Sequence, residues 1–181
     1  MLGILAISGS LRADSTNSAL LRAAAEVAPN EVSIDLYDRL GDLPIFNPNL
    51  EERSFLALLD LRRRLAAADG LLIASPEYAH GVPGGLKNLL DWAVGWEEFS
   101  GKPVALFHTS PYGEHAKAAL AEVLKTMSAC LIPAANLDVN LRGKKPAEMA
   151  AILALPETAA AIRNALVAFG HGIPACGKSA A

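Results

Sequence analysis

Three almost uninterrupted apolar runs constrain the fold of this chain more strongly than any other feature of its sequence. They occupy residues 2–7, 70–75 and 103–107. Each run is followed by a polar or glycine-bearing loop and then by a segment with the apolar spacing of a helix. A short run that is apolar throughout is typical of a strand buried on both faces of a parallel sheet. The alternation predicts an α/β domain, because right-handed crossovers place helices on both faces of the sheet.

The segments between these runs supply the remaining elements. Residues 32–36 alternate apolar and polar side chains, which favours a strand at the edge of the sheet. A short strand near residues 130–132 and the alternating Leu137, Val139 and Leu141 complete the pattern. A first helix, capped by Ser15 or Asn17, is expected to run to about Ala28. Further helices are expected at about residues 51–67, 84–94, 115–127 and 156–169.

The position of the second strand sets the predicted topology. If residues 32–36 form an edge, the chain returns past the first strand to add the third, which gives a doubly wound, five-stranded parallel sheet with the order 2-1-3-4-5. We expect one three-layer domain over residues 1–181, with a flexible tail from about residue 170. The loops at residues 8–17, 76–85 and 109–114 then meet at the switch point, where open α/β sheets bind ligands.

The first of these loops has the composition of an anion-binding site. It contains Ser10, Arg12, Ser15, Thr16 and Asn17 between the first strand and the first helix. A helix that begins past a glycine-containing turn directs unpaired backbone amides and the positive end of its dipole at the turn, which suits a phosphate. The hydroxyls add neutral donors, and the guanidinium matches the geometry of a phosphate. The alternative from these residues alone is a hydroxyl-rich helix cap with a solvated arginine.

The second loop combines stiffness with room for a flat ligand. Residues 75–85 contain two prolines and three glycines, which restrict the turn and let backbone amides approach a ligand closely. Tyr78 offers an apolar wall. The loop contains no nucleophile beside a base. The alternative is a purely structural turn.

Taken together, the motifs resemble those of the NAD(P)H-dependent FMN reductase family of flavodoxin-like oxidoreductases, and the resemblance covers nearly the whole chain. The family pattern GSLRxxSxN is similar to residues 9–17, and the pattern PEYN-x-x-x-PG-x-LKN-x-x-DW is similar to residues 76–92. Two departures are visible. Ala79 stands where the commonest pattern has asparagine, and the third loop, residues 110–115, lacks the glycine pair that many members show.

The resemblance implies a flavodoxin-like fold, a bound FMN and a set of residues that hold it. The phosphate of FMN is expected in the first loop, at Ser10, Arg12, Ser15, Thr16 and Asn17. The edge of the isoalloxazine ring is expected against the second loop, at Pro76, Glu77, Tyr78, Ala79, His80 and Gly81. The far side of the ring is expected against the third loop, at Ser110 and Gly113. The departure at Ala79 removes any side-chain contact that an asparagine makes there.

The resemblance also implies an activity in which the protein binds and orients its ligands. NAD(P)H transfers a hydride to FMN, and the flavin then reduces a quinone, a free flavin, an azo or nitro compound, or chromate in a ping-pong scheme. No residue is expected to act as a catalytic acid, base or nucleophile. Two alternatives stay open. One is a flavodoxin-like electron carrier that reacts slowly with NAD(P)H, and the other is a nucleotide-binding or sugar-transfer enzyme without flavin on the same fold.

Composition limits the partners and the compartment. The chain has 52% hydrophobic and 19% charged residues and a net charge of -3, which favours neither a nucleic acid nor a membrane surface as partner. No apolar run approaches the ~20 residues that a membrane span needs, and no basic region precedes the first strand, so we expect a soluble, unprocessed, cytoplasmic protein. In the family that the chain resembles, helices beside the flavin commonly form subunit contacts, so a homodimer or homotetramer is expected. Trp92, Trp96 and Phe99 cluster around the end of the 84–94 helix, where they are expected either in the core of the domain or in the subunit contact.

Three further patterns are interpreted as unrelated to function. Cys130 and Cys176 belong to no CxxC pair and are expected to be reduced, with Cys130 packed as a small apolar residue. Residues 172–179 fit the pattern GxxxxGK[ST], but a helix precedes them and almost no chain follows, so no ATP site is predicted. No metal site is expected, because no metal-ligand spacing links the histidines, His80, His108, His115 and His171. His80 is either a substrate contact or a plain loop residue.

Overall fold

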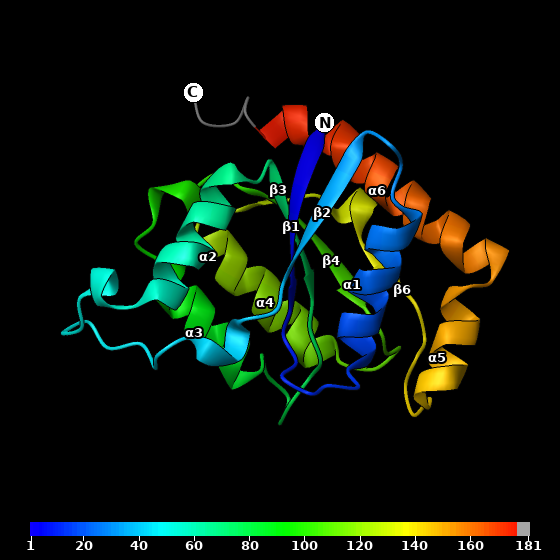
Figure 1. Cartoon of the computed structure of the whole chain (residues 1–181), viewed down its shortest axis with the longest axis horizontal. Coiled ribbons are helices and arrows are strands. Elements are labelled where there is room, and N and C mark those ends of the chain that lie inside the picture. Colours follow the sequence, from blue (N-terminus) through cyan, green and yellow to red (C-terminus); the bar gives the residue numbers. More distant parts are fainter. Residues whose placement is uncertain (177–181) are drawn as a thin grey trace.

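The computed structural model describes residues 1–176, and its centre is a parallel sheet of six strands (Figure 1). The strands are β1 (Leu2–Ser8), β2 (Val32–Tyr37), β3 (Gly70–Ala74), β4 (Pro103–His108), β5 (Cys130–Leu131) and β6 (Leu137–Asp138). Their order is β2-β1-β3-β4-β5, and β6 also pairs with β4. The predicted doubly wound α/β fold and the strand order 2-1-3-4-5 are confirmed.

The fifth strand of the predicted sheet is divided into two short segments. β5 pairs with the start of β4, where Cys130 lies opposite Pro103, and β6 pairs with its end, where Asp138 lies opposite His108. A 3-10 turn separates the two, and the Asn136 side chain after it accepts a hydrogen bond from the Leu106 amide at 2.8 Å. This division keeps the chain beside β4 as far as the carboxyl end of the sheet.

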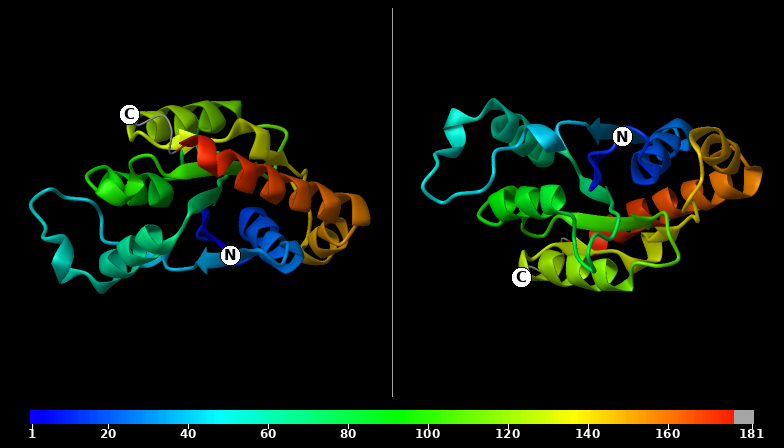
Figure 2. Two further views of the ribbon diagram at one scale, coloured as in Figure 1. Left: turned by 90° about the horizontal axis from the view of Figure 1, so that it is seen from above. Right: turned by 90° about the horizontal axis from the view of Figure 1, so that it is seen from below.

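Helices cover both faces of the sheet (Figures 1 and 2). One face carries α2 (Leu56–Ala67), α3 (Gly84–Ala93) and α4 (Glu114–Thr126), and the other carries α1 (Thr16–Val27), α5 (Pro146–Leu153) and α6 (Pro156–Cys176). Successive side chains of a strand point to opposite faces. Leu5 and Ile7 therefore pack under the first set of helices, whereas Ile4 and Ala6 pack under the second. The central strands are buried on both faces, as their apolar runs predicted.

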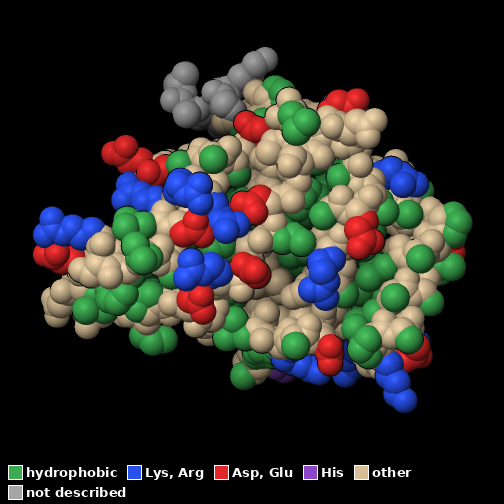
Figure 3. All heavy atoms as spheres, viewed as in Figure 1, with side chains coloured by type: hydrophobic (Ala, Val, Ile, Leu, Met, Phe, Trp, Pro, Cys, Tyr) green, Lys and Arg blue, Asp and Glu red, His purple; other side chains and the backbone are tan. Residues whose placement is uncertain are grey.

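Helix α2 begins at Leu56, later than its predicted start at residue 51. Residues 52–54 before it form a separate 3-10 turn. The Glu52 carboxylate of this turn accepts hydrogen bonds from Arg62 at 3.2 Å and from Trp96 Nε1 at 2.8 Å. Basic and acidic side chains lie side by side over this part of the surface (Figure 3). Each arginine of the run at residues 62–64 pairs with a carboxylate, as expected for a solvated helix face.

Helix α5 was not predicted, because its buried apolar residues are only Met149 and Leu153 in an alanine-rich segment. It begins at Pro146, and the Glu148 carboxylate accepts a hydrogen bond from the Lys145 amide at 2.8 Å, which stabilises the start of the helix.

No helix within residues 1–176 is by itself long and apolar enough to cross a membrane. Helices α5 and α6, bent by 69° at their junction, meet that test only as a pair.

The carboxyl-terminal part of the chain differs from expectation in two ways. Helix α6 continues to Cys176, so residues 170–176 are helical rather than the start of a tail. Gly172 allows α6 to pack closely on Ile132, because a Cβ there would lie 2.6 Å from Ile132 Cγ2.

Cys176 forms a disulfide with Cys130 of β5, so the prediction of reduced cysteines is wrong in this structure. The pair is separated by 46 residues, and only the packing of α6 across the sheet brings it together. Residues 177–181, which include the end of the GxxxxGK[ST]-like stretch, lie outside the described residues.

Candidate functional site

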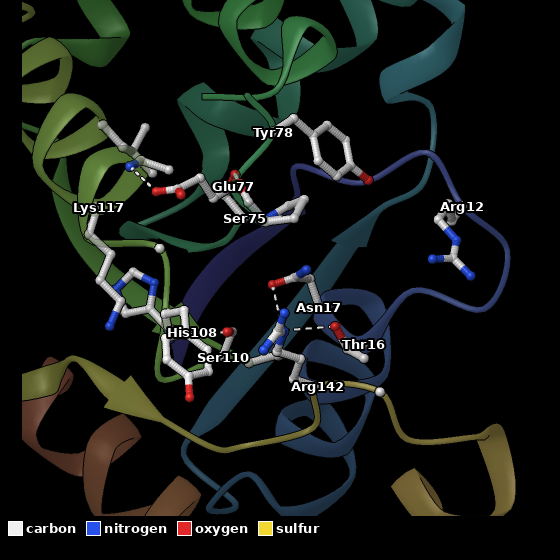
Figure 4. Close-up of a pocket in the computed structure, with 17 residues that line it drawn as sticks. Arg12, Thr16, Asn17, Ser75, Glu77, Tyr78, His108, Ser110, Lys117 and Arg142 are labelled. Atoms are coloured by element: carbon white, nitrogen blue, oxygen red, sulfur yellow. Dashed lines mark hydrogen bonds between the residues drawn. The ribbon is translucent and has the colours of Figure 1, made fainter. Parts of the chain in front are cut away.

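A cavity of about 460 Å³ opens at the carboxyl ends of β1, β3 and β4 (Figure 4). The three loops that were predicted to meet do line it together, and helix α4 and the turn between β6 and α5 complete its wall. The lining residues are Arg12, Thr16, Asn17, Ser75, Pro76, Glu77, Tyr78, His108, Thr109, Ser110, Tyr112, Gly113, Ala116, Lys117, Leu120, Arg142 and Gly143.

The start of α1 forms one edge of the cavity. Ser15 has an extended backbone, and its Oγ accepts a hydrogen bond from the Ser18 amide at 3.3 Å, so Ser15 is the N-cap. No acceptor within residues 1–176 bonds the backbone amides of Thr16 and Asn17. Both residues line the cavity. Free amides and the positive end of a helix dipole at this edge suit an anionic ligand.

Side-chain hydrogen bonds tie this helix start to the third loop. Thr109 Oγ1 donates to Asn17 Oδ1 at 3.3 Å, and the hydroxyls of Thr16 and Thr109 are 2.8 Å apart. Because the Thr109 proton is used toward Asn17, the Thr16 hydroxyl is the donor to Thr109. Asn17 and Thr109 are both buried. The network fixes the position of the α1 start relative to the end of β4.

Ser10 and Ser15, which were predicted to hold a phosphate, do not line the cavity. Ser15 caps α1, and Ser10 is used inside its own loop. The Ser10 amide donates to Ser8 Oγ at 3.3 Å, and Ser10 Oγ accepts from the Arg12 amide at 3.3 Å. Both serines therefore shape the loop that presents Arg12 to the cavity. Arg12 forms no ion pair with a carboxylate of residues 1–176.

The second loop contains a tight two-residue turn. The Tyr78 amide donates to the Gly81 carbonyl at 3.1 Å, and the Gly81 amide donates to the Tyr78 carbonyl at 2.9 Å. Ala79 and His80 between them have φ values of 48° and 59°, the left-handed pair of a type I′ turn, which favours asparagine and glycine. Pro76, Glu77 and Tyr78 line the cavity, whereas Ala79, His80 and Gly81 do not.

Two contacts join the second loop to the start of α4. Glu77 Oε2 accepts a hydrogen bond from the Ala116 amide at 2.8 Å. The His80 ring stacks on the His115 ring with 4.4 Å between their centroids. Gly113, at the N-cap of α4, has a φ of 116°, a conformation that favours glycine. Glu77 is thus engaged by the backbone of α4, and the predicted third-loop residues Ser110 and Gly113 both line the cavity.

Basic side chains outnumber acidic ones in the cavity lining, with Arg12, Lys117 and Arg142 against Glu77. Lys117 Nζ pairs with Asp138 at 2.9 Å and with Glu114 at 3.4 Å. Burial acts to lower the pKa of Lys117, but the hydrogen bond and charge of Asp138 raise that pKa above its ordinary value. Burial, assisted by the charge of Lys117, lowers the pKa of His108, so this histidine is neutral at pH 7. The cavity therefore favours an anion.

Sequence reasoning missed two parts of the site for different reasons. Thr109 and Tyr112 belong to the predicted third loop, and their place after an apolar strand could have indicated them. Lys117 and Arg142 carry no such signal, because the packing of α4 and β6 against β4 brings them to the cavity. Within residues 1–176, no group of three or more His, Cys, Asp and Glu side chains is arranged to hold a metal ion.

The fold and the cavity define a class of protein: a flavodoxin-like α/β domain whose cavity lies at the start of its first helix, between the loops at the carboxyl ends of the strands. Residues 2–141 match the model of the NADPH-dependent FMN reductase family. The chain therefore belongs to the NADPH-dependent FMN reductase family.

Individual relatives agree with this assignment. The chain is 41% identical over 112 residues to a 2-hydroxy-1,4-benzoquinone reductase of a Burkholderia species, a match that covers 60% of this chain and 61% of that protein. It is 43% identical over 110 residues to an NAD(P)H-dependent FMN reductase of Pseudomonas aeruginosa, covering 59% of each. The match thus spans less than two thirds of the length of these relatives.

A solved structure is similar over nearly the full chain. It is FerB of Paracoccus denitrificans, described as a flavoenzyme NAD(P)H:(acceptor) oxidoreductase. The two share 27% sequence identity with a TM-score of 0.79, and the match covers 97% of this chain and 98% of FerB. The similarity therefore includes α5 and α6, which lie beyond the residues matched by the family model.

Proposed function

We propose that the protein is an NAD(P)H-dependent FMN oxidoreductase that reduces a small-molecule acceptor. The observation that carries this proposal is the meeting, in one cavity, of three features: a helix start whose first amides have no acceptor within residues 1–176, an Arg12 that pairs with no carboxylate of those residues, and two loops with aromatic side chains. The names of the relatives, quinone reductase and FMN reductase among them, support it. The electron carrier and the flavin-free nucleotide enzyme are the competing functions on the same fold.

The donors at the start of α1 fit the phosphate of FMN. The amides of Thr16 and Asn17 have no acceptor within residues 1–176. Arg12 adds a guanidinium that forms no ion pair with those residues, and the helix dipole favours a negative charge at this position. Ser10 and Ser15 support the phosphate site by shaping the loop and capping the helix. This donor set matches the chemistry of a phosphate ester.

The second and third loops fit a flat aromatic ring system. Tyr78 and Tyr112 present aromatic side chains from the two loops, and they are 49% and 67% exposed. Pro76 adds a stiff wall, and Gly113, which has no side chain, leaves room for a ring beside the backbone. When bound, FMN supplies the redox chemistry, accepting a hydride from NAD(P)H and passing electrons to the acceptor. The residues of the chain bind and orient the ring between the loops.

Two titratable side chains of the cavity, Glu77 and Lys117, hold its walls together. Glu77 accepts from the Ala116 amide, and Lys117 pairs with Asp138. His108 is buried at the end of β4, and burial keeps it neutral at pH 7 by lowering its pKa. These contacts position α4 and the third loop. We therefore assign no catalytic acid or base, which accords with flavin chemistry.

Quinones are the proposed class of acceptor, because relatives from Burkholderia and Escherichia coli are named as reductases of quinones.

A homodimer or homotetramer is also part of the proposal. Trp92, Trp96 and Phe99 are buried within the subunit, so they belong to the core. Exposed apolar side chains remain for subunit contacts, at Ile45, Leu56 and Val94. Sedimentation velocity of the purified chain tests the assembly, and a monomer at all concentrations contradicts it.

A cytoplasmic location is the proposed compartment. The Cys130–Cys176 disulfide weighs against it, because disulfides are rare in reducing compartments. Alkylation of the thiols in intact cells, followed by mass spectrometry, measures the oxidised fraction. Mostly reduced cysteines support the cytoplasm, and a fully formed disulfide in cells argues for an oxidising compartment.

A visible absorption spectrum tests the proposed function. It is recorded on the purified protein, after addition of FMN, and again after addition of NADPH without oxygen. We expect bound flavin that bleaches rapidly with NADPH and is reoxidised by a quinone. Bound flavin that stays oxidised with NADPH and with NADH supports the electron carrier instead. A chain that binds no FMN contradicts the proposal and supports a different ligand in the same cavity.

A further inference from the structure

The turn between β6 and α5 brings an arginine to the cavity from the side opposite the first loop. Arg142 and Gly143 line the same cavity as Thr16 and Asn17. The Arg142 side chain extends from its turn toward the space between Asn17 and Ser110 (Figure 4). Gly143 has a φ of 71°, which lets the chain turn back toward α5 directly after the arginine. The turn therefore presents Arg142 to whatever occupies the cavity.

Among residues 1–176, an aromatic ring and not a carboxylate lies against the Arg142 guanidinium. Its Cζ atom lies 4.8 Å from the centroid of the Tyr112 ring. No carboxylate within residues 1–176 forms an ion pair with Arg142, in contrast to Arg39 and Arg62. A guanidinium stacked on a ring keeps its N–H edge available for a planar or tetrahedral anion.

Lys117 and Glu77, two other charged residues of the cavity, already have partners, so they are not free to bind an anion. Lys117 is neutralised by Asp138 and Glu114. Glu77, the carboxylate of the lining, is bonded to the Ala116 amide. The guanidinium groups of the lining that pair with no carboxylate of residues 1–176 are Arg12 from the first loop and Arg142 from the β6–α5 turn. In Figure 4 they lie on either side of Thr16.

We propose that Arg142 is a second phosphate ligand of this site, a positioning residue that binds the phosphate from the side opposite Arg12. The inference rests on the proposed function, in which the phosphate belongs to FMN or to NAD(P)H. The recognised chemistry is the same for both, because a guanidinium fork forms two parallel hydrogen bonds with phosphate oxygens. The experiment separates the two sources.

The test compares the affinities for FMN and for riboflavin, which has the same ring and ribityl chain but no phosphate. Both are measured by quenching of flavin fluorescence. We expect Arg142→Ala to weaken FMN binding by about tenfold to a hundredfold, to change riboflavin binding by less than about twofold, and to be partly rescued by Arg142→Lys. Arg163→Ala is the matched control, because Arg163 is an exposed arginine of α6 outside the cavity.

The other outcomes are equally informative. An unchanged FMN affinity with a tenfold or larger rise in the KM for NADPH assigns Arg142 to the phosphates of the dinucleotide and supports its role as a phosphate ligand. Equal losses for FMN and riboflavin, or no change in either affinity or in KM, overturn the inference.

The failure of the proposed function is distinguishable from the failure of this inference. If the unmodified protein binds no flavin, the proposed function fails. Thermal unfolding with and without inorganic pyrophosphate then decides the role of Arg142. Protection that is lost in Arg142→Ala but kept in Arg163→Ala supports a phosphate ligand, and protection that is absent or equal in both variants overturns it.

Discussion

The Glu77 carboxylate accepts a hydrogen bond from the Ala116 amide at 2.8 Å, and this bond joins the loop after β3 to the first turn of α4. The first amides of a helix lack acceptors within the helix, so Glu77 caps α4 from another part of the chain. Its negative charge also lies at the positive end of the helix dipole. One acidic residue therefore holds two walls of the cavity at a fixed separation.

Replacing Glu77 by alanine tests this cap. We expect Glu77→Ala to lower the free energy of unfolding by about 1 to 2 kcal/mol in urea denaturation, because the partly buried Ala116 amide at the helix start loses its acceptor. Glu122→Ala is the control, since Glu122 is an exposed acid of the same helix and its loss should cost less than about 0.5 kcal/mol. Equal, small losses in both variants would contradict the assignment of Glu77 as the cap.

The turn after Tyr78 offers a gain in stability. Ala79 has a φ of 48°, which is unfavourable for alanine and tolerated by asparagine. We expect Ala79→Asn to raise the free energy of unfolding by about 0.5 to 1 kcal/mol and Ala79→Val to lower it. Thermal melts of the two variants check the prediction. An asparagine variant that is less stable than the parent shows that the left-handed conformation at this position is not the source of strain.

Arg12 provides a direct test of the proposed phosphate site at the start of α1. A charge-assisted hydrogen bond to phosphate contributes about 1.5 to 3 kcal/mol. We therefore expect Arg12→Ala to weaken FMN binding by about tenfold to a hundredfold, with riboflavin binding nearly unchanged. Fluorescence titration measures both affinities, with Arg163→Ala as the control for the loss of one positive charge. An unchanged FMN affinity removes Arg12 from the phosphate site.

His108 makes stability depend on pH in a defined direction. Burial, with a further contribution from Lys117, lowers the pKa of His108 in the folded protein, while Asp138 and Glu114 oppose the shift. In the unfolded chain the pKa is about 6.5. The unfolded state therefore binds the proton first as the pH falls. The stability is greatest above about pH 6.5 and declines as the pH falls from there through the lowered pKa.

The His108→Gln variant isolates this effect, because glutamine keeps a polar side chain but does not titrate. Urea denaturation of both proteins at pH 7.5 and at lower pH gives the difference in unfolding free energy, in which all shared titrations cancel. We expect the parent protein to lose more stability than the variant on acidification. Parallel pH profiles for the two proteins would show that His108 is protonated equally easily in the folded and unfolded states.

The Cys130–Cys176 disulfide predicts a redox-dependent stability. The bond joins α6 to β5 across 46 residues of sequence, and it restricts the unfolded chain. We expect Cys176→Ser to lower the free energy of unfolding by about 2 to 4 kcal/mol. The double variant Cys130→Ser/Cys176→Ser should show a similar loss, since either substitution alone removes the bond. A reductant that leaves the parent protein as stable as before contradicts a stabilising role.

Much of the fold could be predicted from local pattern. The apolar runs at residues 2–7, 70–75 and 103–107 became β1, β3 and β4, because a strand buried on both faces needs apolar side chains at every position. The alternation at residues 32–36 marked an edge, and that edge determined the strand order. Helix α5 was not predicted because its two buried apolar residues, Met149 and Leu153, are too few to form a recognisable apolar face of a helix. The end of α6 was not predicted because its glycines suggest a break, whereas Gly172 packs closely on Ile132.

The sequence by itself determined that a loop rich in hydroxyl groups follows the first strand and that two further loops join it at one end of a parallel sheet. The tertiary structure decided which side chains reach the cavity. Ser10 is used inside its loop, and Glu77 is engaged by α4. Arg142 enters from a turn that no local pattern marks. The reason is physical: strands and helices follow from the periodicity of neighbouring residues, but a cavity wall is assembled from segments whose proximity depends on how the helices pack.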